Sequence, residues 1–338
     1  MSSITPSQIT LTDEERDAFA QVATSLEEFD PVTRAEEFVF NAQIQSARLP
    51  ERIRRAMAHF RRMGGDAGGM LVRGLPVDPV PPTPEHADFA LGVNTPAARV
   101  FALAAALVGE QYGFLAELRG RIVQDILPVA GFEDTQQSIS SRAPLELHCE
   151  TVFTENRADV IGLLCLRPDP EHIAGTVLTS TSMFLPLLDD KTVAILHEPR
   201  FSTTVDGSFL RGGKIDHPIV VGPIKVLDGG NLRPRLRCDF AETKGLDDAA
   251  QTALDALYQA ACATLIEVRL DAGDLLLIDN HDAFHGRTPF KFHQSPDDRW
   301  LLRTFITRDL SRSCGDRPGD GRIVDRDYTV GPDIMASR

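Results

Sequence analysis

The sequence predicts a mainly β protein with helical additions, an α+β chain whose core is a β-sandwich or a jelly roll. Two observations support this prediction. After Gly120, short runs rich in Val, Ile, Leu and Thr recur, and turns separate them. Few of these runs alternate with helices, which argues against a doubly wound sheet of βαβ units. Because we see no convincing boundary, we expect one domain over residues 1–338.

Residues 1–119 are expected to be mostly helical and to pack on the β core. A helical pattern runs from about Thr10 to Met63, and within it Ile53, Met57 and Phe60 recur at helical spacing. Three further elements are expected here: a short strand at Met70–Pro76, an ordered proline-rich loop up to Pro96 and a helix at about 97–109.

Residues 120–310 are expected to form the β core, and residues 311–338 a C-terminal tail. The polar stretch 202–243 contains several glycines and predicts a loop-rich lid. Helical patterns cover about 186–196 and about 247–266. The expected core strands are Ile122–Leu127, Val160–Leu166, Thr176–Thr181, Leu275–Ile278 and Leu301–Thr307.

Composition and charge narrow the functional classes. The chain has 35 basic and 49 acidic residues and a net charge of −14, which disfavours nucleic acid and anionic membranes as partners. No apolar run approaches the roughly 20 residues of a membrane span, and the N-terminus lacks the features of a signal peptide. We therefore expect a cytoplasmic protein. The sequence leaves the oligomeric state open, with a homo-oligomer among the alternatives.

The most informative stretch is Leu147-His148-Cys149-Glu150-Thr151. Residues i and i+2 of an extended strand point to the same face, so His148 and Glu150 are expected to converge on one point. A metal that accepts both nitrogen and oxygen ligands could bind there. Two ligands hold a catalytic metal poorly, so the pattern predicts a third elsewhere in the chain.

Two histidines compete for the place of the third ligand. An apolar strand follows Ala272-Gly273-Asp274, and His281 and His285 come at its far end. We favour His285, because it precedes Gly286-Arg287 and a glycine permits close approach of the backbone. His281 is the alternative.

Together, His148, Glu150 and His285 would form a two-histidine, one-carboxylate facial triad, which leaves positions of an octahedral iron(II) open for substrate and oxygen. A zinc hydrolase with two histidines and a glutamate is the alternative metal site, but such enzymes usually carry His-Glu-x-x-His on a helix. The sequence has no such motif.

Two arginines follow His285 at even offsets. Arg299 lies fourteen residues after His285, and Arg303 lies four further on. The even offset places both on the same side of a strand. Guanidinium groups bind carboxylates in a bidentate manner, so two such arginines near a metal suggest two carboxylates to be held. Solvated strand residues are the simpler alternative.

With these residues the sequence resembles the clavaminate synthase-like iron(II)/2-oxoglutarate oxygenases, in particular the branch that hydroxylates free arginine, asparagine and lysine. The resemblance covers about Gly120 to Arg308 and implies a double-stranded β-helix (jelly roll) core. It depends on these motifs and their order: Val123-Gln124-Asp125, Leu145–Glu150, Leu164–Arg167, Thr176, Ile278-Asp279-Asn280, His285-Gly286-Arg287, Arg299 and Arg303.

The resemblance implies roles for individual residues. Iron(II) would be held by His148, Glu150 and His285, and the co-substrate 2-oxoglutarate by Arg299 with Thr176 nearby. The α-carboxylate of a small-molecule amino acid substrate would bind Arg303, and O2 would be the oxidant. The remaining substrate contacts would come from Gln124 and Glu150, at the α-amine, and from Ser140 or Ser141, at the carboxylate.

The resemblance also implies that Asp239 contacts the far end of the substrate side chain. An acid there suits a cationic or amide side chain, which favours a basic amino acid. The alternative is that Asp239 caps the backbone or pairs with Arg235 or Arg237. Two positions depart from the family pattern. Cys149 replaces a threonine, and Ser140-Ser141 replaces Gly-Ser, which puts the carboxylate contact of those serines in doubt.

Three functions are therefore weighed. The first is a dioxygenase that hydroxylates C3 or C4 of a free L-amino acid and releases succinate and CO2. A carboxylate ligand such as Glu150 favours hydroxylation over halogenation. The second is an oxygenase acting on a carrier-tethered amino acid or a peptide. The third is a non-catalytic jelly-roll module that binds an amino acid.

Overall fold

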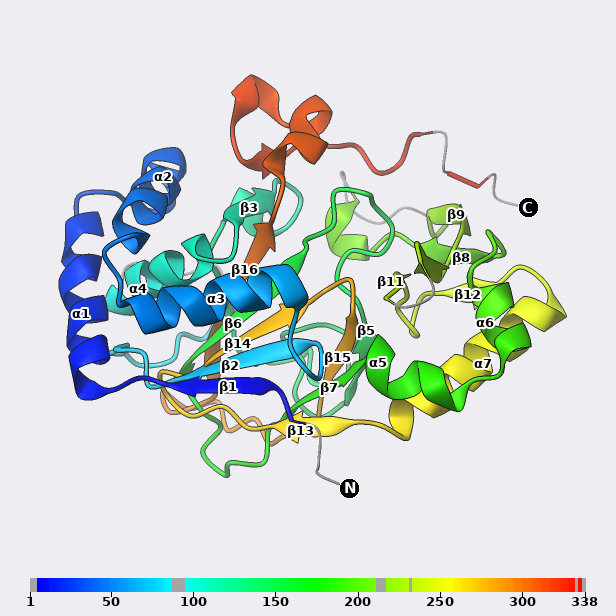
Figure 1. Cartoon of the computed structure of the whole chain (residues 1–338), viewed down its shortest axis with the longest axis horizontal. Coiled ribbons are helices and arrows are strands. Elements are labelled where there is room, and N and C mark those ends of the chain that lie inside the picture. The colour runs from blue at the N-terminus through cyan, green and yellow to red at the C-terminus, as the bar shows by residue number, and fades with distance from the viewer. Residues whose placement is uncertain (1–4, 87–94, 211–216, 231–232, 332–333, 336–338) are drawn as a thin grey trace.

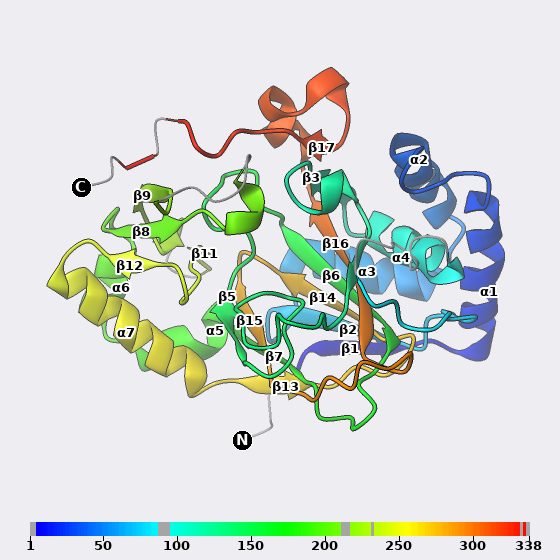
Figure 2. The same ribbon diagram turned by 180° about the vertical axis from the view of Figure 1, so that it is seen from behind.

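The structure combines β-sheets in its centre with two groups of helices, one at each end of the molecule (Figure 1). The computed structural model describes residues 5–86, 95–210, 217–230, 233–331 and 334–335. The view from behind shows the same arrangement, with the sheets between the helical ends (Figure 2). The α+β class predicted from the sequence is confirmed.

The N-terminal helices follow the predicted pattern. Thr12 begins the first helix with a capping box: its hydroxyl accepts the Glu15 N–H at 3.3 Å, and the Glu15 carboxylate accepts the Thr12 N–H at 2.9 Å. The side chains of Ile53, Met57 and Phe60 are buried. The helices are α1 (Asp13–Ala23), α2 (Ala35–Ser46), α3 (Glu51–Met63) and α4 (Pro96–Ala106).

The large sheet carries one wall of the site. Its central strands are antiparallel, with Leu276 opposite Leu163 and Leu302 opposite Leu164. The hydrogen-bonded order is β1 (Ser7–Thr10), β2 (Gly69–Arg73), β14 (Leu275–Asp279), β6 (Val160–Arg167), β16 (Trp300–Thr307), β3 (Glu110–Phe114) and β17 (Ile323–Val324), and β4 (Gln124–Ile126) also pairs with β16.

Helix α4 covers the outer face of this sheet. Its apolar side chains are almost fully buried, and Phe101 packs over Gly162 of β6. A Cβ at Gly162 would lie only 2.9 Å from the Phe101 ring, so glycine is required for this close approach.

A second sheet of four strands carries the histidines. Its order is β13 (Ile266–Val268), β7 (Thr176–Ser180), β15 (Ala283–Arg287) and β5 (Leu145–His148), and neighbouring strands are antiparallel. The side chains of Leu178 in β7 and Leu276 in β14 both approach Gly69, at the contact between the two sheets. Truncating a buried leucine of this kind to alanine lowers the free energy of unfolding by about 2–5 kcal/mol.

The second group of helices lies beyond the four-stranded sheet. It contains α5 (Thr181–Phe184), α6 (Asp190–Leu196) and α7 (Asp248–Cys262). Helices α6 and α7 correspond to the helical segments expected at about 186–196 and 247–266. The second expected segment extends too far, because the chain turns after Cys262 and enters strand β13. None of the helices in the described residues is long and apolar enough to cross a membrane.

The lid predicted as loop-rich contains short strands. A three-stranded sheet has the order β12 (Lys244–Gly245), β8 (Phe201–Thr204) and β9 (Val220–Ile224), and β10 (Leu227–Asp228) pairs with β11 (Arg235–Leu236). Glycine and proline within β9 weaken its sequence signal. Part of the expected lid (211–216, 231–232) and of the proline-rich loop (87–94) lies outside the described residues.

Candidate active site

Three side chains with metal-binding atoms meet at one edge of the four-stranded sheet. His148 is the last residue of β5, and His285 is its register partner on β15. Their ring centroids lie 4.3 Å apart. The Glu150 Oε1 atom lies 3.9 Å from His148 Nε2 and 3.7 Å from His285 Nε2. One ligand atom from each lies within 4.8 Å of the others, and the described part of the chain holds no other such group.

Glu150 reaches this group from a turn rather than from a strand. Strand β5 ends at His148, the Cys149 N–H donates to the Cys238 carbonyl at 2.8 Å, and Thr151 has a φ of 53°. The prediction that His148 and Glu150 share the face of one extended strand is therefore wrong about the backbone. The side chains nevertheless converge, because the turn brings the Glu150 carboxylate back toward the two imidazoles.

The local setting of His285 also differs from the one predicted from the sequence. It lies in the middle of β15 and not at the far end of the preceding apolar strand, because β14 ends at Asp279 and a turn intervenes. Gly286 has the expected role of permitting close approach. A Cβ on it would lie 2.6 Å from the Leu145 carbonyl oxygen, so glycine lets β15 and β5 come together beside the histidines.

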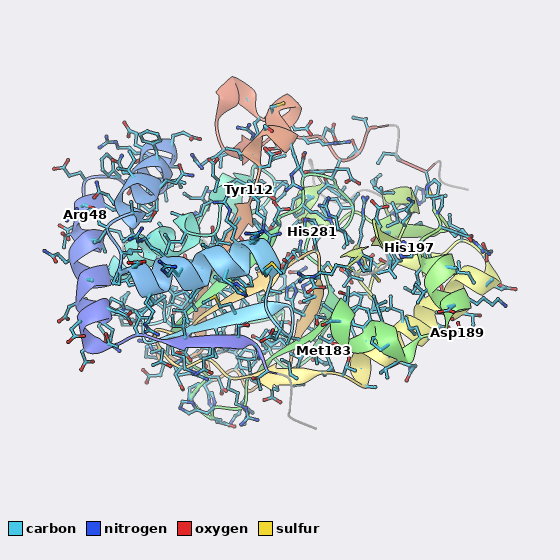
Figure 3. The ribbon with its side chains drawn as sticks, in the orientation of Figure 1. Arg48, Tyr112, Met183, Asp189, His197 and His281 are labelled. Atoms are coloured by element: carbon cyan, nitrogen blue, oxygen red, sulfur yellow. The ribbon has the colours of Figure 1, made fainter. Side chains whose placement is uncertain are left out.

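The competing histidine, His281, is held elsewhere, near the middle of the molecule in Figure 3. Its Nε2 lies 2.8 Å from Asp159 Oδ1, and its side chain also contacts Arg235. Burial, with Arg157 and Arg235, lowers the pKa of His281 to about 4, although Asp159 opposes this shift. His281 is thus a neutral, hydrogen-bonded histidine outside the three-residue group.

The hydrogen bonds around His148 and the charge of Glu150 suit metal binding once His148 has lost its Nε2 proton. The Glu146 carbonyl oxygen lies 2.8 Å from His148 Nδ1, so Nδ1–H can donate to it and leave Nε2 free for a metal. Burial raises the pKa of Glu150, but Arg303 and the two histidines outweigh it and hold the pKa well below its usual value. Two imidazole nitrogens and one ionised carboxylate form the donor set that fits iron(II).

Arg303 lies directly beside this metal-binding group. It is 6% exposed, and its Nη1 donates to Glu150 Oε1 at 3.3 Å. Gln124 Oε1 accepts from Arg303 Nε at 2.9 Å and from Nη2 at 2.7 Å, in register across β4 and β16. A third partner is Glu117, whose carboxylate accepts from Nη2. The structure therefore brings Gln124, Glu150 and Arg303 together.

Arg299 and Thr176 lie in a separate buried region. Arg299 immediately precedes β16, is 7% exposed and stacks on Phe290 with 5.5 Å between guanidinium and ring. Phe290 also contacts Arg287, the register partner of Thr176. Within the described residues, Arg299 forms no ion pair with a carboxylate, so a buried cation is available to an anionic ligand.

Ser140 and Ser141 are placed differently from the expectation. Both are buried, and Arg287 donates to the Ser140 carbonyl and, at 3.0 Å, to its hydroxyl. Neither serine lines the cavity next to Arg303, where this stretch contributes Ser138 and Ile139.

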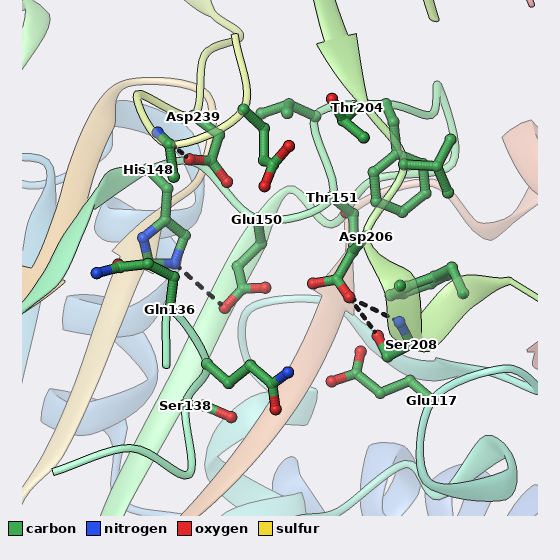
Figure 4. A pocket seen from close by; sticks show the side chains of 18 of the residues that line it. Glu117, Gln136, Ser138, His148, Glu150, Thr151, Thr204, Asp206, Ser208 and Asp239 are labelled. Carbon is green, nitrogen blue, oxygen red and sulfur yellow. Dashed lines mark hydrogen bonds and ion pairs between the residues drawn. The ribbon is translucent and has the colours of Figure 1, made fainter. Parts of the chain in front are cut away.

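A cavity of about 670 Å³ opens beside the metal-binding group. His148, Glu150 and Arg303 line it, together with Thr204–Leu210 from the lid region (Figure 4). Among the described residues its lining is rich in acids and contains one arginine. The acids are Glu117, Asp125, Glu146, Glu150, Asp206, Asp239 and Glu242.

Asp239 lines this cavity and does not pair with either neighbouring arginine. Arg235 contacts His281, and Arg237 pairs with Glu155. Asp239 Oδ1 accepts the Ala241 N–H at 2.8 Å, so part of the expected backbone cap is present. Burial raises the pKa of Asp239, while His148 opposes this shift.

Three acids in the cavity, Glu117, Asp206 and Glu242, were missed by sequence reasoning. Glu117 lies 31 to 33 residues before His148 and Glu150, and its surroundings show no motif that marks it. Asp206 begins a short turn in the lid, where its Oδ1 accepts the Ser208 N–H at 2.8 Å. An aspartate two residues before a serine is an ordinary turn signal, so the sequence could not distinguish this residue.

A two-histidine, one-carboxylate group beside a buried arginine and a cavity defines the class of non-haem iron(II) oxygenases. The family model described as "Taurine catabolism dioxygenase TauD, TfdA family" matches residues 28–305. The chain belongs to this family.

Similar proteins agree with this assignment. An L-asparagine oxygenase of Streptomyces coelicolor is 39% identical over 277 residues, which are 81% of each chain. An L-lysine 3-hydroxylase of Catenulispora acidiphila is 36% identical over 86% of this chain and 81% of that protein.

Solved structures extend the likeness to the fold. Asparagine oxygenase in complex with Fe(II), 2S,3S-3-hydroxyasparagine and succinate has a TM-score of 0.86 and 36% identity, over 94% of this chain and 98% of that chain. The non-haem iron oxygenase OrfP with Fe, succinate and (3S)-hydroxy-L-Arg has a TM-score of 0.83 and 30% identity, over 94% and 99%. The protein is a 2-oxoglutarate-dependent non-haem iron dioxygenase.

Proposed function

We propose that the protein hydroxylates C3 or C4 of a free L-amino acid with a basic side chain of the arginine or lysine type. The observation that carries this proposal is the acidic cavity that lies between the metal-binding group and the lid. His148, Glu150 and His285 would hold the iron(II), which when bound supplies oxygen activation and cleavage of an unactivated C–H bond. The protein positions the reactants around it.

Arg299 would bind the distal carboxylate of 2-oxoglutarate, with the Thr176 hydroxyl as a second donor. Burial and the charge of Arg299 together lower the pKa of Arg287 to about 9. An anion beside these two guanidinium groups would relieve their repulsion, and a buried arginine without a carboxylate partner gains most from a charge-assisted hydrogen bond.

Arg303 would bind the α-carboxylate of the substrate. Its guanidinium is preorganised by Gln124 and Glu117, and it lies beside the proposed iron ligand Glu150. The α-ammonium would contact Gln124 and Glu150, as expected from the sequence, and Glu117 adds a third acceptor. A substrate bound this way lies next to the metal.

The distal wall of the cavity would select the side chain. Asp239, Asp206 and Glu242 add carboxylates to the lining of the same cavity, and Figure 4 shows Asp239 and Asp206 there. A cationic side chain would offset their mutual repulsion, whereas an amide would satisfy them only in part. The similar proteins act on asparagine and on lysine, so both side-chain classes are compatible with this fold.

An oxygenase acting on a carrier-tethered amino acid or a peptide is the alternative. The buried position of Arg303 supports the free amino acid, because a thioester or peptide bond removes the carboxylate charge that this guanidinium would pair with. Three expectations from the sequence stay predictions: a jelly-roll core, a single domain over 1–338 and a cytoplasmic location.

The test is a panel of free L-amino acids incubated with Fe(II), 2-oxoglutarate and O2, with succinate as the readout. We expect arginine, lysine or ornithine to give the highest coupled succinate formation, and their methyl esters to be poor substrates. Preferential turnover of an ester or a peptide would support the alternative and contradict the proposal.

A further inference from the structure

Asn280 lies behind the metal-binding group and contacts the backbone of one of its members. It follows strand β14, precedes His285 by five residues and is 0% exposed. Its Oδ1 accepts the Glu150 N–H at 2.7 Å, and its Nδ2 donates to the Glu150 carbonyl at 3.2 Å. Nδ2 also donates to the Ala158 carbonyl at 2.9 Å.

These contacts replace the strand pairing that ends at His148. Beyond that residue Glu150 occupies a turn, and the positive φ of Thr151 turns the chain away from β5. One carboxamide therefore satisfies both the N–H and the C=O of the residue that carries the carboxylate. A side chain that offers an acceptor and two donors without charge is required, and asparagine meets this requirement.

The position of Asn280 in the chain adds a second consequence. Asn280 lies in the turn that joins β14 of the eight-stranded sheet to β15 of the four-stranded sheet, the strand that carries His285. The Asn280 N–H donates to the Asp159 carbonyl at 3.0 Å, which fixes the turn. The segment from β14 to β15 thus supplies His285 directly and, through Asn280, binds the backbone of Glu150. The spacing between these two side chains depends on Asn280.

We propose that Asn280 is a positioning residue for the iron site, which sets the location of the Glu150 carboxylate relative to His285. This proposal rests on the proposed triad of His148, Glu150 and His285. Asn280 itself touches neither substrate nor metal. Its effect is expected in metal affinity and in the ligand geometry around the metal.

The test compares Asn280→Ala and Asn280→Asp with a matched control, Asn156→Ala. Asn156 is also buried and hydrogen-bonded, but its Nδ2 donates to Asp316, away from the metal-binding group. Anaerobic Fe(II) affinity is measured by competition with a chelating dye. The charge-transfer absorption of the protein with Fe(II) and 2-oxoglutarate reports the ligand geometry.

We expect Asn280→Ala to weaken Fe(II) binding by about 10–100-fold, as removal of a group that orients a metal ligand typically does, and to shift the absorption band. Asn280→Asp keeps the acceptor for the Glu150 N–H but lacks the Nδ2 donor, so it should lie between Asn280→Ala and the wild type. Asn156→Ala should lose thermal stability while keeping the wild-type affinity and spectrum.

Wild-type Fe(II) affinity and absorption in folded Asn280→Ala would overturn the proposal. If Asn280→Ala does not fold, the same result in Asn280→Asp overturns it. A Glu150→Ala variant distinguishes a failure of the proposed triad from a failure of the role proposed for Asn280. If Glu150→Ala retains Fe(II), the proposed triad itself fails, whereas loss of Fe(II) in Glu150→Ala with full binding in the Asn280 variants refutes only the role of Asn280.

Discussion

Arg303 donates a hydrogen bond to the same oxygen of Glu150 that faces the two histidines. The distance from Nη1 to Oε1 is 3.3 Å, and Oε1 lies 3.7 Å from His285 Nε2. The proposed anchor for the substrate carboxylate therefore adjoins a proposed iron ligand. This relationship predicts that substrate and metal sites are coupled through a single carboxylate oxygen.

The first prediction concerns Arg303→Lys. Lysine keeps the charge but loses the planar fork that Gln124, Glu117 and a substrate carboxylate share. A charge-assisted hydrogen bond is worth about 1.5–3 kcal/mol, so kcat/KM for the amino acid should fall by about 10–150-fold, while the apparent affinity for the co-substrate changes little. Steady-state kinetics with the amino acid and the co-substrate varied in turn measures this.

The control for that variant is Arg167→Lys, because Arg167 binds the Thr83 hydroxyl and the Pro81 carbonyl in the proline-rich loop, away from the cavity. It should retain wild-type kinetics. Equal losses of kcat/KM in both variants would contradict the role of Arg303 in binding the α-carboxylate of the substrate. An Arg303→Lys variant that loses only apparent affinity for the co-substrate would contradict it as well.

The second prediction concerns pH and metal binding. Burial lowers the pKa of His148, but Glu150, Asp239 and the Glu146 carbonyl outweigh it and raise the pKa to about 9. Burial and the charge of His148 lower the pKa of His285 to about 4. At neutral pH His148 is therefore protonated and His285 neutral in the metal-free protein, so binding of one metal ion should release one proton.

Metal affinity should accordingly rise about tenfold per pH unit between pH 6 and 8 and level off near pH 9, since protons compete with the metal for His148. Titration with Ni(II), which is redox-inert here, in weakly buffered solution gives both the affinity and the proton release. A pH-independent affinity without proton release would refute the assigned protonation states.

The metal-binding triad could be predicted because His148-x-Glu150 and His285-Gly286 have short, recognisable spacing. The pattern could not predict the turn that carries Glu150. Thr151 has a positive φ there, which is uncommon for a β-branched residue, and the sequence gives no signal for it. His281 and His285 were also hard to distinguish in sequence. They differ in the fold, where Asp159 binds His281 at 2.8 Å.

The acidic wall of the cavity could be predicted only in part. Asp239 was found through its place in the lid region, whereas Glu117 and Asp206 come from a loop and a turn far from the ligands in sequence. Glu117 follows β3, which pairs with β16, and only the fold brings it to the same cavity as Asp206 and Asp239. The core strands, in contrast, carry long apolar runs that mark them directly.

The third prediction concerns substrate preference in Asp239→Asn. Removing the negative charge should lower kcat/KM for a basic amino acid by about 10–100-fold, corresponding to loss of one charge-assisted hydrogen bond, and should change kcat/KM for asparagine much less. Competition between lysine and asparagine in one reaction measures the ratio directly.

Asp248→Asn is the matched control for Asp239→Asn, since Asp248 is an exposed acid in the first turn of α7. It should leave the ratio of lysine to asparagine turnover unchanged. A ratio that stays constant in Asp239→Asn as well would place recognition of the substrate side chain elsewhere, with Asp206 and Glu242 as the next candidates.

The fourth prediction concerns the C-terminal tail. Tyr328 packs edge-on against Phe153 and Phe209, at ring distances of 5.2 and 5.6 Å, and both phenylalanines line the cavity. Tyr328→Ala should destabilise the fold by about 3 kcal/mol through the cavity it leaves and should raise KM for the amino acid. Thermal unfolding and kinetics test this together.

Tyr328→Phe keeps the ring contacts and should retain both stability and KM. If Tyr328→Ala lowers stability without raising KM, the tail stabilises the fold but does not shape the substrate site.

Incorporation of oxygen from ¹⁸O2 tests the central claim most directly. With lysine or arginine, Fe(II) and 2-oxoglutarate, one labelled oxygen atom should appear in the hydroxylated amino acid and the other in succinate, in equal amounts by mass spectrometry. Labelled succinate without a labelled amino acid product, for every basic amino acid in the panel, would contradict the assignment of this protein as a hydroxylase of basic amino acids.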